Sequence, residues 1–395
     1  MADRVRVRAA VSLLTGIVFV GLLVLPALDS ALGVDRTTPP QEKRELAPRP
    51  GLPRSLRSIA ELPKAFDAYL ADHFGFRSLL IRLHSRVAVC WLGVPPSPNV
   101  EILVGRHGWL FFTGDESITY IEGRNPFSES DLEAWRRSLR QRNEWLARRG
   151  IRYLVVFAPG SPSIYPEHLP RWVRPSPHGT RLDQLMGAMQ RCPEVPVLDL
   201  RPALLGIKKL APAYSPTDTH WNMVGAWAAY DGIMKALTRW FPQAQPTPPS
   251  GFDVAWGRGP GGDLAAMAGI QGLVSEPIVW VAPRTPSRWR TLPSGDYATL
   301  RAWPKLQEPV ITVRDHGDIP RVVVFRDSFS VALVPYLSEH FGRAVYLWIQ
   351  DFEASPIERE KPDLVIQEYT ERLLSVLNPA TWPDLAAEPM KPARN

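Results

Sequence analysis

Cysteine is scarce in this sequence, and histidine is not clustered. Cys90 and Cys192 are the only two cysteines among 395 residues. Two thiols exclude a framework of several disulfides and a zinc site with four thiolates, but they leave open a single disulfide between them. The eight histidines are not grouped at the spacing of metal ligands. We therefore expect no metal centre and no bound cofactor.

A nucleotide-binding loop and a dense basic run are also missing. The stretch GRGPGG at 257–262 lacks the Lys-Ser/Thr pair of a phosphate-binding loop and follows no clear strand. The net charge is +6, yet the Lys and Arg residues are scattered along the chain. This distribution argues against nucleic acid as a partner. Hydrophobic residues at 45% and charged residues at 22% instead indicate an ordinary globular protein with a sizeable core.

The first uncharged run lies close to the N-terminus. Residues 9–28 carry no charge, and the preceding MADRVRVR contains three arginines. Twenty apolar residues in a helix span about 30 Å, the thickness of the hydrocarbon core of a membrane. Residues 1–8 should then form a cytoplasmic tip, with the rest of the chain exported. A cleaved signal peptide is the alternative, but its apolar region is usually shorter, at about 7–15 residues. The sequence favours an uncleaved single-pass anchor in the cell inner membrane and a periplasmic main domain.

Two segments of different composition follow this run. Residues 29–55 are polar and rich in proline, which is typical of an extended linker. Residues 56–100 form a predicted juxtamembrane helical segment that DHFGFR, at 72–77, interrupts. The first part of this segment carries one apolar stripe, made up of Leu62, Phe66, Leu70 and Phe74.

The pattern of apolar segments in residues 101–378 predicts an α/β domain. VGRHGWLFF at 104–112 indicates a hairpin with a turn between two glycines. Apolar strands are expected at 151–159, 195–200, 321–327, 343–349 and 363–368. Helices are expected at 128–150, 180–191, 221–240, 329–341 and 369–377. This alternation predicts a doubly wound parallel sheet.

Two stretches fall outside the alternation. Residues 242–320 are rich in Pro and Gly, with short strand candidates at 278–282 and 309–314. We expect them to be an irregular insertion that lies over one end of the sheet. Residues 379–395 are expected to form a disordered tail.

FRDSFS, residues 325–330, places Asp-Ser at the end of a predicted strand. The carboxyl end of a parallel strand is where α/β enzymes present a nucleophile. Asp and Ser are also ordinary helix N-caps, so this stretch alone leaves both roles open for Ser328.

A second polar motif supports the nucleophile interpretation. Asp218 and His220 lie in SPTDTHWNMVGAWAAY, 215–230, just before a predicted helix. An Asp can hold the imidazole through Nδ1, which frees Nε2 to take a proton from a Ser. Capping of the helix by Asp218 or Thr219 is the alternative. Both motifs can reach the carboxyl edge of one sheet. We therefore favour the interpretation as a nucleophilic site over the interpretation as helix caps.

TDTHWN followed by FRDSFS is similar to the SGNH hydrolase-like domain of alginate O-acetyltransferases, the AlgJ/AlgX-like family. The likeness covers nearly all of residues 40–378, and in both the Asp-x-His element precedes the Ser, in reverse of common SGNH esterases. Further stretches resemble the family in the same order: ELAPRP at 45–50, DHFGFR at 72–77, GRHGWLFF at 105–112, IYPEHLP at 164–170, GGDLA at 261–265 and RDSFSVALVPYLSEHFGRAVYLW at 326–348. The resemblance implies an SGNH-hydrolase-like fold. It also implies that Ser328 is the nucleophile, His220 the general base and Asp218 its orienter.

The sequence departs from common SGNH enzymes around the expected oxyanion hole. Arg326 stands where those enzymes have Gly before Asp-Ser, and their oxyanion Gly and Asn blocks are not found. We assign the backbone N–H of Ser328 and the side chain of Asn222 as oxyanion donors. Glu368 and Arg372, four residues apart, could line the cleft, although a structural i,i+4 pair is the favoured interpretation.

The resemblance implies an O-acetyltransferase that acetylates hydroxyls of an exported polysaccharide through an acyl-enzyme. A membrane-bound O-acyltransferase is the implied acetyl donor partner. A carbohydrate esterase or deacetylase is one alternative, since transfer and hydrolysis share the same residues. A non-catalytic polysaccharide-binding scaffold subunit of an export complex is the other, and the intact Asp218, His220 and Ser328 argue against it.

Overall fold

The computed structural model describes residues 2–35, 46–297, 307–314 and 319–385. These form two compact units. The first holds the chain up to Val100 together with Ala265–Val274, and the second holds Glu101–Leu264 and the chain from Ser275 onward.

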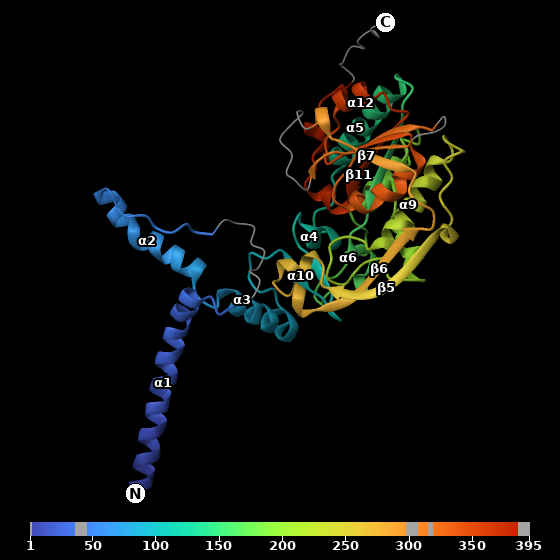
Figure 1. The fold of residues 1–395 in the computed structure, drawn as a ribbon. Coiled ribbons are helices and arrows are strands. Elements are labelled where there is room, and N and C mark those ends of the chain that lie inside the picture. Colours follow the sequence, from blue (N-terminus) through green and yellow to red (C-terminus); the bar gives the residue numbers. More distant parts are fainter. Residues whose placement is uncertain (1, 36–45, 298–306, 315–318, 386–395) are drawn as a thin grey trace. The chain divides into compact units, whose positions relative to one another are not determined.

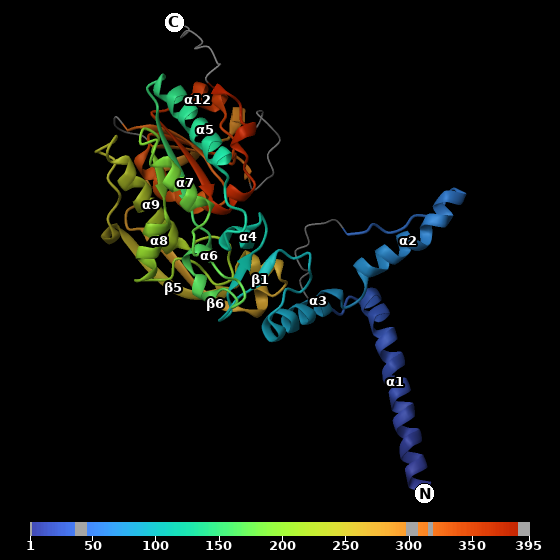
Figure 2. The same cartoon turned by 180° about the vertical axis from the view of Figure 1, so that it is seen from behind.

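The chain contains both α-helices and β-strands (Figures 1 and 2). The α-helices are α1 (Ala2–Leu32), α2 (Leu56–His73), α3 (Arg77–Arg86), α4 (Ser117–Ile121), α5 (Glu129–Ala147), α6 (Ser161–Ile164), α7 (Arg181–Met189), α8 (Arg201–Lys208), α9 (Met223–Leu237), α10 (Asp263–Met267), α11 (Val334–Leu337) and α12 (Ala354–Glu360). The strands are β1 (Ile102–Val104), β2 (Leu110–Phe112), β3 (Arg152–Ala158), β4 (Val197–Asp199), β5 (Phe252–Pro260), β6 (Ser275–Pro283), β7 (Trp289–Leu292), β8 (Val310–Arg314), β9 (Arg321–Phe325), β10 (Arg343–Leu347) and β11 (Leu364–Thr370).

The second unit is built on one mixed sheet with the strand order β4-β3-β11-β9-β10-β8-β7. The five predicted strands are all present, adjacent and mutually parallel, which confirms the α/β prediction. Every residue of β11 is buried, so both faces of the sheet are covered. The predicted hairpin is also present, since β1 pairs with β2 and the turn between them passes through His107 and Gly108 at positive φ.

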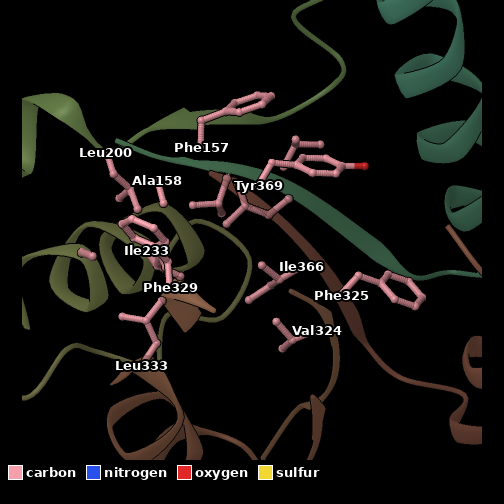
Figure 3. Packing of buried hydrophobic residues seen from close by; sticks show 14 of the residues in the cluster. Phe157, Ala158, Leu200, Ile233, Val324, Phe325, Phe329, Leu333, Ile366 and Tyr369 are labelled. Atoms are coloured by element: carbon pink, nitrogen blue, oxygen red, sulfur yellow. The ribbon is translucent and has the colours of Figure 1, made fainter. Parts of the chain in front are cut away.

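The core gathers where the central strands meet the segments that follow them. Val324 of β9 and Ile366 of β11 are about 1% exposed, and Ile233 of α9 is equally buried. Phe329, four residues beyond the end of this central strand, is fully buried among them (Figure 3). The chain just after β9 is therefore fixed by packing, and this chain carries Ser328.

Two predicted helices are wrong. Residues 329–341 form a 3₁₀ turn, the short α11 and a second 3₁₀ turn, because Pro335 lacks the N–H that a longer helix needs. Residues 369–377 are not helical at their start, since β11 runs on to Thr370 and a 3₁₀ turn, Glu371–Ser375, follows.

The insertion prediction is wrong in one respect. β5 and β6 form a separate antiparallel ribbon, and β6 includes the candidate at 278–282. The candidate at 309–314 becomes β8, which pairs antiparallel with β10 and in turn with β7. The insertion therefore extends the main sheet by two strands. Its residues 298–306 and 315–318 lie outside the described residues.

The expected tail begins later than 379. Residues 379–381 form a 3₁₀ turn, and Leu385 is buried. The Trp382 ring packs edge-on against Trp135 of α5 at 5.2 Å and lies under the Arg142 guanidinium at 3.7 Å. This aromatic and cation–π packing fixes the segment. Residues 386–395 lie outside the described residues.

In the first unit, α1 begins before the predicted span and ends after it. Ala10–Leu32 has a mean hydropathy of 2.5, and its large apolar side chains are exposed. Such a helix is compatible with a single-pass anchor or a signal sequence. The predicted apolar stripe lies along α2, where Phe66 and Leu70 are about half exposed. Of the expected linker, residues 29–32 belong to α1, and 36–45 lie outside the described residues. Both cysteines are free thiols, Cys90 exposed and Cys192 buried.

Glu360 connects α12 to the N-terminal ends of β9 and β10. Its carboxylate is 5% exposed and accepts hydrogen bonds from Arg343 Nε at 2.6 Å, Arg321 at 3.0 Å and the Tyr297 hydroxyl at 2.7 Å. Burial opposes ionisation, but these hydrogen bonds outweigh it and lower the pKa of Glu360 from 4.5 to about 2. The charged form is thus the stabilising form.

Replacing Glu360 with Gln should lower the free energy of unfolding by about 2–3 kcal/mol at pH 7, because two arginines and a tyrosine lose a charged partner. A carboxylate with a lowered pKa in the folded state stabilises the fold at pH values above its unfolded-state pKa. This stabilisation is lost as the pH falls toward the pKa of the folded state. The gap between the two proteins should therefore narrow between about pH 4.5 and pH 2. Urea midpoints across this range measure it. A gap that stays constant with pH would contradict the assignment.

Candidate active site

The structure brings the three predicted residues together, with His220 between Asp218 and Ser328. His220 Nδ1 lies 3.0 Å from Asp218 Oδ1, and His220 Nε2 lies 2.9 Å from Ser328 Oγ. Both distances are those of hydrogen bonds, and the order of the groups is that of a Ser-His-Asp arrangement. Such a chain of contacts can carry a proton from the serine hydroxyl to the imidazole.

Ser328 is held at the end of β9 by its neighbour Asp327. The buried Asp327 carboxylate accepts hydrogen bonds from the Phe329 N–H at 2.8 Å, from the Thr370 N–H at 2.8 Å and from the Thr370 hydroxyl. These bonds join the turn after β9 to the last residue of β11. The Ser328 hydroxyl itself makes no capping hydrogen bond to the following turn. This geometry favours the nucleophile interpretation of the motif over the capping one.

The loop with Asp218 and His220 is fixed from both sides. Asp218 Oδ1 accepts a hydrogen bond from the backbone N–H of His220 at 2.8 Å and is also hydrogen-bonded to the ring Nδ1 of His220. These two contacts hold the Asp-x-His motif in one conformation. The preceding Thr217 donates its hydroxyl to Glu276 of β6 at 2.9 Å. On the other side, the His220 ring packs against Phe329 with 5.1 Å between ring centroids.

A second carboxylate, which the sequence analysis did not assign, also faces His220. Asp263 Oδ2 lies 3.6 Å from His220 Nδ1, and Asp263 Oδ1 accepts the Thr219 N–H at 2.7 Å. The approach requires glycine at 262, because a Cβ there would lie 2.6 Å from the Cβ of Asp218. The signal in the sequence was GGDLA, whose glycine allows this close approach.

The two carboxylates make His220 more basic. Burial alone lowers the pKa of His220, but the hydrogen bond and charge of Asp218, followed by the charge of Asp263, raise it above its ordinary 6.5. Burial and the charge of Asp218 raise the pKa of Asp263, whereas hydrogen bonds from His220 lower that of Asp218 against the effect of burial. Asp218 is therefore the carboxylate that stays ionised most readily beside the imidazole.

These residues are also the described side chains that a metal ion could share, since one ligand atom from each of Asp218, His220 and Asp263 lies within 4.8 Å of the others. A cation there would compete with the proton on His220 Nδ1. In the structure, Asp218 Oδ1 is hydrogen-bonded to the ring Nδ1 and the backbone N–H of His220, and Asp263 Oδ1 accepts the Thr219 N–H.

A small cavity of about 30 Å³ adjoins the site. Its lining residues are Phe112, Ser117, Tyr120, Ile121, Gly160, Ser161, Pro162, Thr219, Glu371 and Arg372. The Arg372 guanidinium is bound to Asp115 at 3.0 Å and lies 5.8 Å from the centre of the Phe329 ring. Its positive charge acts on His220 in the direction that lowers the pKa. The cavity thus has one cationic wall near His220.

The favoured interpretation of Glu368 and Arg372 as an i,i+4 pair is wrong, because Glu368 lies on a strand and Arg372 on a 3₁₀ turn. Glu368 accepts the Asp327 N–H at 3.0 Å and the Ser330 hydroxyl at 2.9 Å. Burial and the negative charge of Asp327 raise the pKa of Glu368 well above its ordinary 4.5. Of the two residues, Arg372 lines the cavity.

The side chain of Asn222 does not have the contacts expected of an oxyanion donor. Its Oδ1 accepts the N–H groups of Val224 and Gly225 at 2.9 and 3.1 Å, and its Nδ2 donates to Pro212 O at 2.8 Å. The side chain is the N-cap of α9. We correct the prediction accordingly: the amide is engaged in capping, and the Ser328 N–H stays a predicted oxyanion donor.

Replacing Asn222 with Ala should therefore destabilise the protein by about 1 kcal/mol, the usual cost of a lost cap. The kcat of the folded fraction should stay within about twofold of the parent value, whereas loss of an oxyanion donor costs about 10²–10³-fold. Thermal melts and initial rates on the same sample separate the two. A loss of kcat at unchanged stability would restore the oxyanion role.

Residues 102–351, more than half of the chain, match the family described as "SGNH hydrolase-like domain, acetyltransferase AlgX". The chain belongs to this family. Over 166 residues it is 27% identical to the probable alginate O-acetylase AlgJ of Pseudomonas aeruginosa, and the match covers 42% of this chain and 40% of AlgJ. The chain thus aligns with well under two thirds of that relative's length.

The chain is also similar to solved structures. Bacillus cereus PatB1 superposes with a TM-score of 0.51 at 14% identity, covering 69% of this chain and 96% of PatB1. The O-acetyltransferase domain of Pseudomonas putida AlgJ gives a TM-score of 0.44 at 19% identity, covering 70% of this chain and 93% of that domain. The SGNH-like α/β fold predicted from the sequence is confirmed by the family match and by the parallel core of the sheet.

Proposed function

We propose that the protein is a polysaccharide O-acetyltransferase that uses Ser328 as its nucleophile. The observation that carries the proposal is the hydrogen bond of 2.9 Å between Ser328 Oγ and His220 Nε2, with Asp218 on the far side of the ring. Membership of a family described by acetyltransferase chemistry supports the reaction class. The name of AlgJ supports an alginate-like polymer as acceptor.

In the first step, Ser328 Oγ attacks the carbonyl carbon of an acetyl donor while its proton passes to His220 Nε2. The donor oxygen leaves with that proton, and an acetyl ester remains on Ser328. In the second step, a sugar hydroxyl gives its proton to His220 and attacks the ester, and the serine oxygen takes the proton back. Asp218 holds the imidazole and stabilises its charged form in both steps.

The proposal extends to location and partners. α1 would anchor the protein in the cell inner membrane as a single pass, with the second unit in the periplasm. Its acetyl donor would be a membrane-bound O-acyltransferase, and its acceptor a polysaccharide on the way out of the cell. The length and hydropathy of Ala10–Leu32 support the anchor.

The experiment uses the full chain in detergent with a chromogenic acetyl ester as donor and uronate oligosaccharides as acceptors. We expect mass spectrometry to show acetyl groups on the sugar and the rate to rise with acceptor concentration. The rate should also increase with pH through the pKa of His220, which lies above 6.5. Acetate release that does not depend on any acceptor would instead identify an esterase. Absence of turnover with several acceptors would favour a scaffold.

A further inference from the structure

The helical segment 77–92, called here the collar helix, has two different faces. It consists of α3 and the π-helical turn Val87–Leu92 that continues it. Within the first unit, its residues Ser85, Ala88 and Val89 are buried. At about 100° per residue, these three lie on one side of the helix.

The other side of the collar helix is apolar and open. Trp91 is 74% exposed, and Leu80 and Leu83 are about half exposed. The full set of apolar residues on this side is Leu79, Leu80, Leu83, Val87 and Trp91, each at least 38% exposed. Their spacing of three or four residues places them on a single arc opposite the buried face. A soluble surface rarely exposes such a contiguous arc without a partner.

Basic residues border the arc. Arg77, Arg82 and Arg86 belong to the collar helix, and the sequence from 77 to 92 contains no acidic residue. Arginine stems can cover apolar surface while the guanidinium groups reach outward to phosphate. An apolar arc with Trp and with arginines at its borders is the composition of a helix that lies in a membrane interface.

The start of the collar helix is fixed to the end of α1. The buried Asp29 of α1 accepts the Phe76 N–H at 2.8 Å. Gly75 approaches the backbone of Pro26 so closely that a Cβ would lie 2.0 Å from the Pro26 carbonyl oxygen. The Ser30 hydroxyl donates to His73 O at 3.4 Å. Figure 1 shows α3 starting at this end of α1.

This attachment decides the kind of partner. If α1 spans the membrane, its C-terminal turn lies at the boundary between lipid and water. The collar helix then begins at that boundary with an apolar arc available for it. Ile59 and Phe66 give α2, which ends at the same turn, a second exposed apolar face, and none of the described residues of α2 is buried.

We propose that the collar helix lies in the outer lipid interface of the membrane that α1 crosses. Leu79, Leu83 and Trp91 would enter the region between headgroups and acyl chains, and the exposed Arg86 would reach the lipid phosphates. The helix would act as a second membrane contact that fixes how the first unit stands on the bilayer. The proposal rests on membrane insertion of α1, which is part of the proposed function, and it does not depend on acetyl transfer.

The protein carries its own probe for this test. Cys90 is exposed and lies in the π-helical turn that also carries Val87 and Trp91, whereas Cys192 is buried. A thiol-reactive bimane should therefore label Cys90 selectively in the folded full chain. The labelled protein is placed in nanodiscs of phosphatidylethanolamine and phosphatidylglycerol, with or without lipids brominated high on the acyl chain.

We expect brominated lipid to quench roughly half of the bimane fluorescence and aqueous iodide to quench little. The variant Leu80→Gln/Leu83→Gln should reverse this pattern, with lipid quenching reduced several-fold. The matched control Leu205→Gln/Leu210→Gln removes two exposed leucines from the second unit and should leave the pattern of the parent. Unchanged far-ultraviolet circular dichroism shows that each variant is folded.

The other outcomes overturn the proposal in distinguishable ways. Strong iodide quenching without lipid quenching means that the arc faces water. Protection from both quenchers means that protein covers it. A chain that does not stay with the nanodisc refutes the anchor in the proposed function, and the lipid contact with it. If the parent protein shows lipid quenching but no acetyl transfer, the proposed reaction is refuted and the lipid contact is not.

Discussion

Replacing Ser328 with Ala should reduce kcat of acetyl transfer by about 10³–10⁶-fold while leaving the free energy of unfolding within about 0.5 kcal/mol of the parent. The reason is that Ser328 Oγ contacts His220 Nε2 and caps no helix. If the residue were a cap, the same change would cost about 0.5–2 kcal/mol and leave the rate of the folded fraction unchanged. Turnover of a chromogenic acetyl ester and thermal melts of the same preparation distinguish the two roles.

Ser330 provides a matched control only two residues away. Its hydroxyl is buried and donates to Glu368 at 2.9 Å, outside the line of Asp218, His220 and Ser328. Ser330→Ala should lower the free energy of unfolding by about 1 kcal/mol, because Glu368 loses one of its donors. The folded fraction should keep a rate within about twofold of the parent. Equal loss of activity in both variants would show that the Ser328 result reflects a disturbed turn after β9.

Four of the five strands that the sequence predicted, β3, β9, β10 and β11, are almost completely buried. β9 and the first half of β11 are runs of apolar residues buried on both faces, and such runs are visible without knowledge of the fold. β7 is short and partly exposed, so its pattern does not differ from that of an irregular segment. β8 was detected as a short strand, but nothing in its residues indicates that it pairs with β10. Pairing across an insertion depends on tertiary contacts that local patterns do not contain.

The site was predictable where its chemistry is local in the chain. Asp218 and His220 are two residues apart, and Ser328 follows a strand that the sequence identifies. Asp263 lies more than 40 residues from His220 and faces it only because Gly262 permits close approach to Asp218. Asn222 was misassigned because a residue next to the Asp-x-His motif can also be the N-cap of the following helix. Its capping contacts become visible only when the helix start is known.

Replacing Asp218 with Asn should lower kcat by about 10⁴-fold, the loss seen when the orienting carboxylate of such a triad becomes an amide. Asp218 Oδ1 accepts hydrogen bonds from both the backbone and the ring Nδ1 of His220. An amide at this position can present its NH₂ group to Nδ1 and favour the tautomer with the proton on Nε2. His220 then has no free lone pair for the Ser328 proton.

Asp263→Asn is the matched variant, and its expected effect is different in kind. The amide oxygen can still accept the Thr219 N–H, so the loop stays in place. The negative charge beside His220 is lost, and this charge helps to raise the pKa of His220. A general base works in its neutral form, above its pKa. Removal of the charge should therefore shift the acidic limb of the pH–rate profile to lower pH, with the plateau of kcat within about tenfold of the parent. If Asp263→Asn instead loses as much activity as Asp218→Asn with the acidic limb unmoved, Asp263 is the orienting carboxylate and the assignment of Asp218 is wrong.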